Sequence, residues 1–178
     1  MGHPGVRGSL RHARLGVMRS LLSLGSMIFL ACAMQAQDAT VPPATQHPVL
    51  TVQGRGVQIY TCKAVSGVGQ WVFVAPAARL FDKDGVEVGT HGDGPVWNWQ
   101  DGSSVIGEVA AKMASPDAGA VPWLLLKAAR TTGSGVLTGV ELIRRSDTKG
   151  GSAPAGACDA GALVRVPYEA TYTFYSSK

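Results

Sequence analysis

Acidic residues are missing from the first 37 positions of the chain, although the same stretch contains four arginines. The arginines are followed by the apolar run "LLSLGSMIFLACAM", which ends in small residues. A basic segment, a short apolar segment and a small-residue end together predict a secretory signal peptide. The apolar run is too short for a membrane-spanning helix, which needs about 20 apolar residues. We therefore expect residues 1–36 to be a signal peptide, cleaved after Ala33 or Ala36, and no transmembrane segment.

A lipid anchor at Cys32 is the alternative to a freely exported protein. Bacterial lipoprotein signals end in leucine, a small residue, glycine or alanine, and then cysteine, and here "FLA" precedes Cys32. Phe29 and Leu30 depart from the first two positions of that pattern. The sequence thus favours a periplasmic or extracellular protein over a lipoprotein.

An excess of positive charge is missing once the signal is set aside. Of the 16 lysines and arginines, the four in the signal are removed, which leaves 12 against 12 acidic residues. The basic isoelectric point is therefore a property of the export signal. No basic stripe remains to neutralise phosphates, and we expect no nucleic-acid partner.

Cysteine is also rare, with three in the chain, of which Cys32 lies in the signal. The remaining pair, Cys62 and Cys158, predicts a structural disulfide in an oxidising compartment. There is no CxxC motif, and no further ligands lie near either cysteine for a zinc site.

Long, capped, amphipathic helices are missing, and the apolar pattern has a period of two. In "YEATYTFY", Tyr168, Ala170, Tyr172 and Phe174 alternate with more polar residues. "FDKDGVEV" predicts a hairpin turn. With 23 glycines and about nine short strands, the chain is expected to be an antiparallel β-sandwich or barrel. We expect a proline-rich linker over residues 37–50 and a single all-β domain over residues 51–178.

Several segments in order along the chain, among them "GVQIYTC", "WVFVAPAARLFDKDGVEVGTHGDGPVWNWQDGSSVIGEV" and "VPYEATYTFY", carry a family resemblance. The chain resembles the family catalogued as domain of unknown function 3455. The family pattern usually has an aromatic residue after the histidine, where this chain has Gly92. The resemblance implies an exported all-β domain with a paired cysteine. It implies no reaction and no catalytic residues.

The stretch "HGDGPVWNWQDGSS", residues 91–104, gathers the candidate functional residues. His91 is the acid–base candidate with an ordinary pKa near neutrality, and Asp93 or Asp101 could complete a hydrolytic or metal-binding set with it. The serines that follow Asp101 lie in no nucleophile elbow. The alternative for Asp101 is a turn in which its carboxylate accepts backbone hydrogen bonds.

Binding by aromatic residues is the other interpretation of this stretch. Trp97 and Trp99 would share one face of a strand, and an exposed Trp97 could stack on a sugar ring, with Asn98, His91 and Asp93 as polar contacts. The alternative is that the tryptophans fill the core. The sequence contains no metal-ligand set with suitable spacing, and "GSGVLTG" lacks both the spacing and the context of a dinucleotide site, so we expect no cofactor.

Arg144 and Arg145 are adjacent, so on a strand they would face opposite ways. One could enter a pocket and pair there with a carboxylate, or both could protect a strand edge. Taken together, the residues favour a non-catalytic ligand-binding module of the cell envelope, a glycan being one candidate ligand. The alternative is a hydrolase or metal-dependent enzyme centred on His91 with Asp93 or Asp101.

Overall fold

The computed structural model describes residues 1–2 and 38–178, and this part of the chain is all β. The strands are β1 (His47–Val65), β2 (Val68–Phe81), β3 (Glu87–Gly92), β4 (Val96–Trp99), β5 (Ser104–Met113), β6 (Trp123–Thr132), β7 (Leu142–Gly150) and β8 (Leu163–Ser176). The chain divides into two units, Met1–Gln35 and Ala36–Lys178, and every one of these strands belongs to the second. Apart from Met1 and Gly2, the predicted signal peptide, with Cys32, lies outside the described residues. Within residues 1–2 and 38–178, no helix has the length and apolar character needed to cross a membrane.

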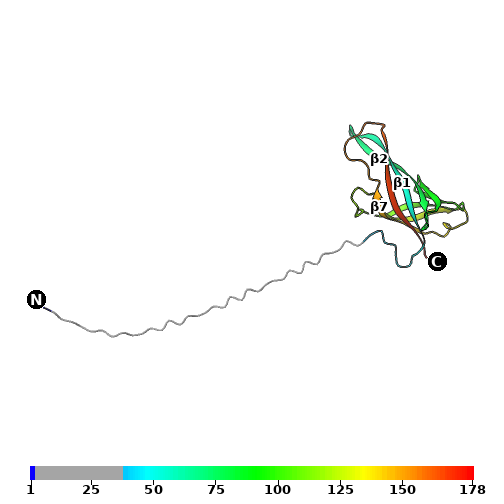
Figure 1. The fold of residues 1–178 in the computed structure, drawn as a ribbon, viewed down its shortest axis with the longest axis horizontal. Helices are drawn as coiled ribbons and strands as arrows, with labels where there is room; N and C mark the ends of the chain where they lie inside the picture. Colours follow the sequence, from blue (N-terminus) through cyan, green and yellow to red (C-terminus); the bar gives the residue numbers. More distant parts are fainter. Residues whose placement is uncertain (3–37) are drawn as a thin grey trace. The chain divides into compact units, whose positions relative to one another are not determined.

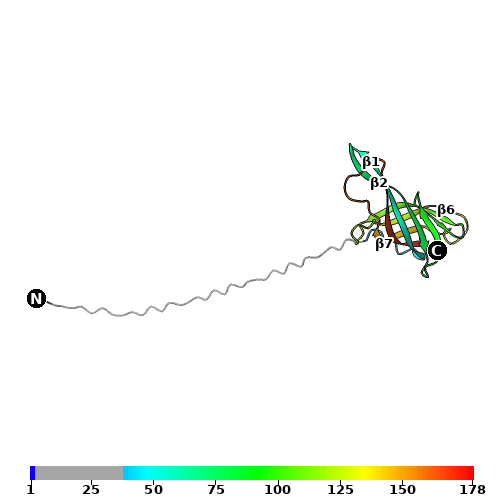
Figure 2. The same cartoon turned by 45° about the horizontal axis from the view of Figure 1, so that its top comes forward.

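The strands form a closed antiparallel barrel (Figures 1 and 2). Each strand pairs with the next one along the chain, and β1 pairs with β8 to close the sheet. The predicted all-β antiparallel fold is confirmed, in its barrel form. The described residues form eight strands rather than about nine, and β1, at 19 residues, is not short.

Alternation along the strands determines which side chains enter the barrel. Tyr168, Ala170, Tyr172 and Phe174 of β8 are all buried, which confirms the period-two interpretation of this segment. One inward ring needs space from the neighbouring strand β1. A Cβ atom at Gly54 would lie 2.5 Å from the Tyr172 ring, so glycine leaves room for this tyrosine.

The predicted hairpin between β2 and β3 is also present. Asp82 Oδ1 accepts hydrogen bonds from the backbone N–H groups of Asp84 and Val86, both at 2.9 Å. Gly85 has φ of 81°, which glycine adopts without strain.

Because neighbouring strands run in opposite directions, the connections gather at the two ends of the barrel. One end, here called the closed end, carries the connections 82–86, 100–103 and 133–141. The 133–141 connection contributes the buried Leu137 and Val140 to the core, alongside Phe174. The other end carries the connections 66–67, 93–95, 114–122 and 151–162.

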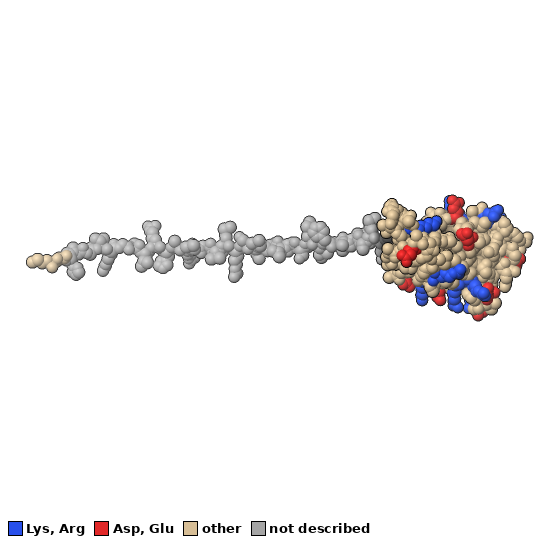
Figure 3. Space-filling view, turned by 90° about the horizontal axis from the view of Figure 1, so that it is seen from above, with Lys and Arg blue, Asp and Glu red and all other residues tan. Residues whose placement is uncertain are grey.

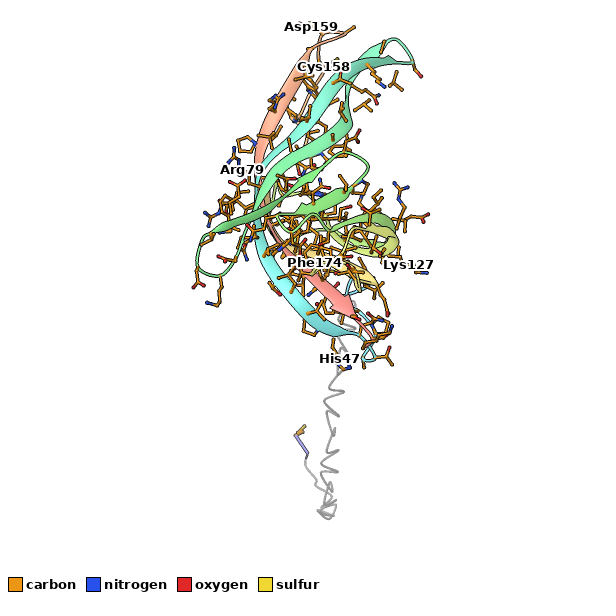
Figure 4. The ribbon with its side chains drawn as sticks, turned by 90° about the vertical axis from the view of Figure 1, so that its right-hand side faces the viewer. His47, Arg79, Lys127, Cys158, Asp159 and Phe174 are labelled. Atoms are coloured by element: carbon orange, nitrogen blue, oxygen red, sulfur yellow. A yellow bond between two sulfur atoms is a disulfide. The ribbon has the colours of Figure 1, made fainter. Side chains whose placement is uncertain are left out.

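A disulfide between Cys62 and Cys158 confirms the predicted pairing. It ties the 151–162 connection to β1, and the end where it lies is here called the disulfide end. Figure 4 shows Cys158 at this end and His47 at the opposite one. The cysteines are 96 residues apart, and closing a loop of that length stabilises the fold by about 4 to 5 kcal/mol in the chain-entropy model.

The residues before the barrel contact its outer surface. Asp38 forms an ion pair with Arg144 at 2.6 Å, and Gln46 donates a hydrogen bond to Glu141. β1 begins at His47, so the last residues of the segment predicted as a linker belong to the sheet. Charged side chains of both signs are interspersed on the face of the barrel seen in Figure 3.

Candidate functional site

A cavity of about 530 Å³ lies in the disulfide end of the barrel. Its apolar and aromatic lining includes Tyr60, Phe73, Trp97, Val109, Leu124, Leu126 and Tyr172. Its polar and charged lining consists of Gln58, His91, Asp93, Lys112 and Arg145. Phe73 and Val109 are 50% and 53% exposed, so they mark the mouth of the cavity. The site is therefore an apolar pocket with a few polar groups, as in most small-molecule sites.

His91 lies on the inner face of β3, where its ring is buried against other rings. Its Nδ1–H donates to the carbonyl oxygen of Val96 at 2.9 Å, since a carbonyl can only accept. The imidazole stacks on Trp97 with ring centroids 4.3 Å apart. The pKa of His91 is lowered to about 4, mainly by burial; the hydrogen bond to Val96 opposes this effect, and the positive charge of Arg145 adds to it. His91 is therefore neutral at pH 7, with its proton on Nδ1.

Trp97 is inside the barrel, with 1% of its surface exposed. A Cβ atom at Gly107 would lie 3.0 Å from the Trp97 ring, so glycine there gives the indole its space. The tryptophan has no open face on the outer surface on which a sugar could stack. It contributes instead to the wall of the cavity.

The other predicted site residues lie at the rim of this cavity or outside it. Asp93 lies at the rim of the cavity, exposed, and accepts a hydrogen bond from the Gly94 N–H. Asn98 is exposed on β4 and does not line this cavity. In residues 1–2 and 38–178, no group of three or more His, Cys, Asp or Glu side chains could hold a metal ion.

Asp101 belongs to the closed end, where it builds a turn. Its Oδ1 accepts from the backbone N–H and the hydroxyl of Ser103, at 2.8 and 2.6 Å. Its Oδ2 accepts from the Val136 N–H at 2.9 Å. The Ser103 hydroxyl bond, followed by the two backbone bonds, holds the pKa of Asp101 below its ordinary value. The turn predicted at this position is confirmed, and it occupies both Asp101 and Ser103.

The two adjacent arginines face opposite ways, as predicted. Arg145 enters the cavity, where Nε and Nη2 donate to the carbonyl oxygen of Pro122 at 3.1 and 2.8 Å. Arg144 points outward, pairs with Asp38, and lies over the ring of Trp123. The alternative of strand-edge protection is wrong, because a closed barrel has no edge.

Sequence reasoning missed a polar layer beside Arg145. Gln58 is 1% exposed, and its Nε2 has no hydrogen-bond partner among the described residues. Tyr60 donates to the Gly151 carbonyl at 2.7 Å, and the hydroxyls of Tyr168 and Tyr172 lie 3.2 Å apart. Burial raises the pKa of all three tyrosines, and the charge of Arg145 opposes that effect. The available signal was the alternation in "GVQIYTC", which places a glutamine on the same strand face as a tyrosine and the cysteine.

One protein-family model, described as "Protein of unknown function (DUF3455)", matches residues 43–176. The chain belongs to this family. The match covers every strand of the barrel, from His47 to Ser176, and confirms the resemblance seen in the sequence. No curated protein and no solved structure matches the chain.

Proposed function

We propose that this member of the DUF3455 family is a non-catalytic binding protein that holds one small, mainly apolar molecule inside its barrel. The observation that carries the proposal is the cavity of about 530 Å³ at the disulfide end. An eight-stranded barrel is just wide enough to hold one small ligand, and ligand cavities commonly measure about 300 to 1,000 Å³.

The chemistry of the lining supports an apolar ligand rather than a glycan. Sugar binding needs many hydrogen-bonding groups and an accessible ring face, whereas most of the lining is aromatic or aliphatic. Trp97, the residue considered for sugar stacking, shows 1% of its surface to solvent. The neutral His91, without a carboxylate partner among the described residues, gives no support to a hydrolase.

The proposal includes export to the periplasm or the extracellular space. Its supports are the signal-peptide pattern of the first 36 residues and the Cys62–Cys158 disulfide, which persists in oxidising compartments. The intact mass of the protein from its own host tests this part. The mass of a chain that begins directly after Ala33 or Ala36 would fit export. The mass of a chain that begins with a lipid-modified Cys32 would identify a lipoprotein. The mass of the uncleaved chain would contradict both.

Titration with N-phenyl-1-naphthylamine, a neutral dye that fluoresces in apolar surroundings, tests ligand binding. We expect saturable binding of one dye per chain, with energy transfer from tryptophan, because Trp97 is part of the cavity wall. Native mass spectrometry of protein from its own host would then identify any retained molecule. A folded, disulfide-bonded protein that binds no dye would contradict the proposed function.

A further inference from the structure

We infer that the ligand is an amphipathic acid, and that Arg145 is the counter-ion of its carboxylate, with Gln58 Nε2 and Trp97 Nε1 as additional donors. This inference rests on the proposed function and names the ligand class for the same cavity. The guanidinium of Arg145 lies in the lining of the cavity, where it could pair with an anionic group of a ligand.

Arg145 has no negatively charged partner in the described chain. Its Nε and Nη2 both donate to one carbonyl oxygen, that of Pro122, and no carboxylate of residues 1–2 and 38–178 lies within ion-pair distance. A partly buried charge is costly unless it is paired. A guanidinium also presents five N–H groups in a fork that matches a carboxylate, so a ligand carboxylate fits this position.

The charges around the cavity favour an anion. Arg145 and Lys112 are positive, Asp93 is the one acidic residue of the lining, and His91 is neutral at pH 7. Asp93 and Lys112 are both exposed, where water screens their charges, which leaves Arg145 as the charge inside the pocket. The interior of the pocket is therefore positive.

The neutral polar groups of the pocket point to the same chemistry. Gln58 Nε2 and Trp97 Nε1 are buried N–H donors without hydrogen-bond partners in the described part of the chain. Gln58 lies close to Tyr168 and lowers the pKa of the Tyr168 hydroxyl, against the effect of burial. Its Nε2 nevertheless makes no hydrogen bond to that hydroxyl. Buried donors without partners are uncommon, because each loses its bonds to water. Carboxylate oxygens accept several hydrogen bonds at once and would satisfy them.

The rest of the cavity accommodates an apolar body and suggests its direction. Gln58 and Trp97 are each 1% exposed and lie deep, whereas Phe73 and Val109 are half exposed at the mouth. Leu124 also lines the pocket. The acidic group would therefore lie inward against Arg145, with the hydrocarbon directed toward the mouth.

Competition between two probes of equal length tests the inference. Octanoate and octan-1-ol are each used at pH 7.5 to displace bound N-phenyl-1-naphthylamine from disulfide-bonded protein. We expect the wild type to bind octanoate at least about tenfold more tightly than octan-1-ol, because only the acid forms an ion pair with Arg145. In Arg145→Gln this preference should disappear, because octanoate binding weakens much more than octan-1-ol binding.

Arg144→Gln is the matched control, since Arg144 lies on the adjacent position but points outward. It should keep the full preference for octanoate. Arg145→Lys retains the charge and should keep part of the preference, and it serves if Arg145→Gln does not fold. Equal binding of the two probes by the wild type, or an unchanged preference in Arg145→Gln, would overturn the acid assignment while leaving the binding function intact. Failure of the dye itself to bind would instead overturn the proposed function.

Discussion

The two ends of the barrel are made by the same strands but are filled in different ways. At the closed end, the 133–141 connection contributes Leu137 and Val140 to the core, and Phe174 is fully buried beside them. At the disulfide end, the 151–162 connection is held against β1 by the Cys62–Cys158 bond, and a cavity of about 530 Å³ remains. One end is therefore stabilised by packing, and the other by a covalent bond beside an unfilled cavity.

The largest effect is expected from removing the disulfide. Cys62→Ala combined with Cys158→Ala should lower the free energy of unfolding by about 4 to 5 kcal/mol, because the unfolded chain regains the entropy of a long loop. Urea unfolding of the variant and of the oxidised wild type measures the difference. Chemical reduction of the wild type should reproduce it. A loss below about 1 kcal/mol would show that the disulfide end is held by packing after all.

A pair of phenylalanines compares the two ends directly. Phe174→Ala at the closed end should cost about 3 to 5 kcal/mol, because it leaves a void in a packed core. Phe73→Ala at the cavity mouth, where the ring is 50% exposed, should cost less than about 1 kcal/mol. Urea unfolding of both variants gives the comparison. Equal losses would contradict the distinction between a packed end and an open one.

The buried His91, in the wall of the cavity, makes stability depend on pH. Its folded pKa of about 4 lies below the ordinary value of 6.5, so the unfolded chain takes up a proton first as the pH falls. Its contribution is complete above pH 6.5 and is lost as the pH falls to about 4, amounting to about 3 kcal/mol.

Unfolding at several pH values between 7 and 4 tests this with His91→Gln. The variant should show a shallower loss of stability than the wild type, because it lacks the imidazole that takes up the proton. The carboxyl groups with lowered pKa values (Asp38, Asp101 and Glu141) lose their contributions at more acidic pH, below ordinary values of 3.8 to 4.5. A slope that persists in His91→Gln would place the titrating group elsewhere.

The smallest expected effect separates two aspartates of one sequence stretch. Asp101→Asn should weaken the turn at the closed end, because its two oxygens accept three hydrogen bonds. Asp93→Asn, at the exposed rim of the cavity, should leave the melting temperature unchanged. If Asp93→Asn lowers the melting temperature more than Asp101→Asn does, Asp101 is not the aspartate that stabilises the fold.

Local pattern was enough to predict the alternation of β8 and the turn between β2 and β3. The alternation of Tyr168, Ala170, Tyr172 and Phe174 is visible within one short stretch of sequence, and so are the turn residues around Asp82. The disulfide followed from counting cysteines. The barrel closure did not follow, because the pairing of β1 with β8 joins segments from opposite ends of the domain.

The cavity was harder to predict because its wall comes from several strands. Gln58, His91 and Arg145 meet there only after the sheet has closed. The sequence indicated that one of two arginines would face inward, but the register decided that it is Arg145. It singled out His91 and Trp97 as functional candidates, whereas the burial of both side chains depends on the barrel that forms around them.

Dye binding to two matched valine variants tests most directly whether the disulfide end is a ligand cavity. Val109→Trp would fill the mouth, where Val109 is 53% exposed, and Val86→Trp would place the same ring at the closed end, where Val86 is 56% exposed. We expect Val109→Trp to weaken N-phenyl-1-naphthylamine binding at least about tenfold, and Val86→Trp to bind like the wild type. Equal binding by both variants would mean that the dye occupies another part of the molecule, and the cavity would no longer explain the function.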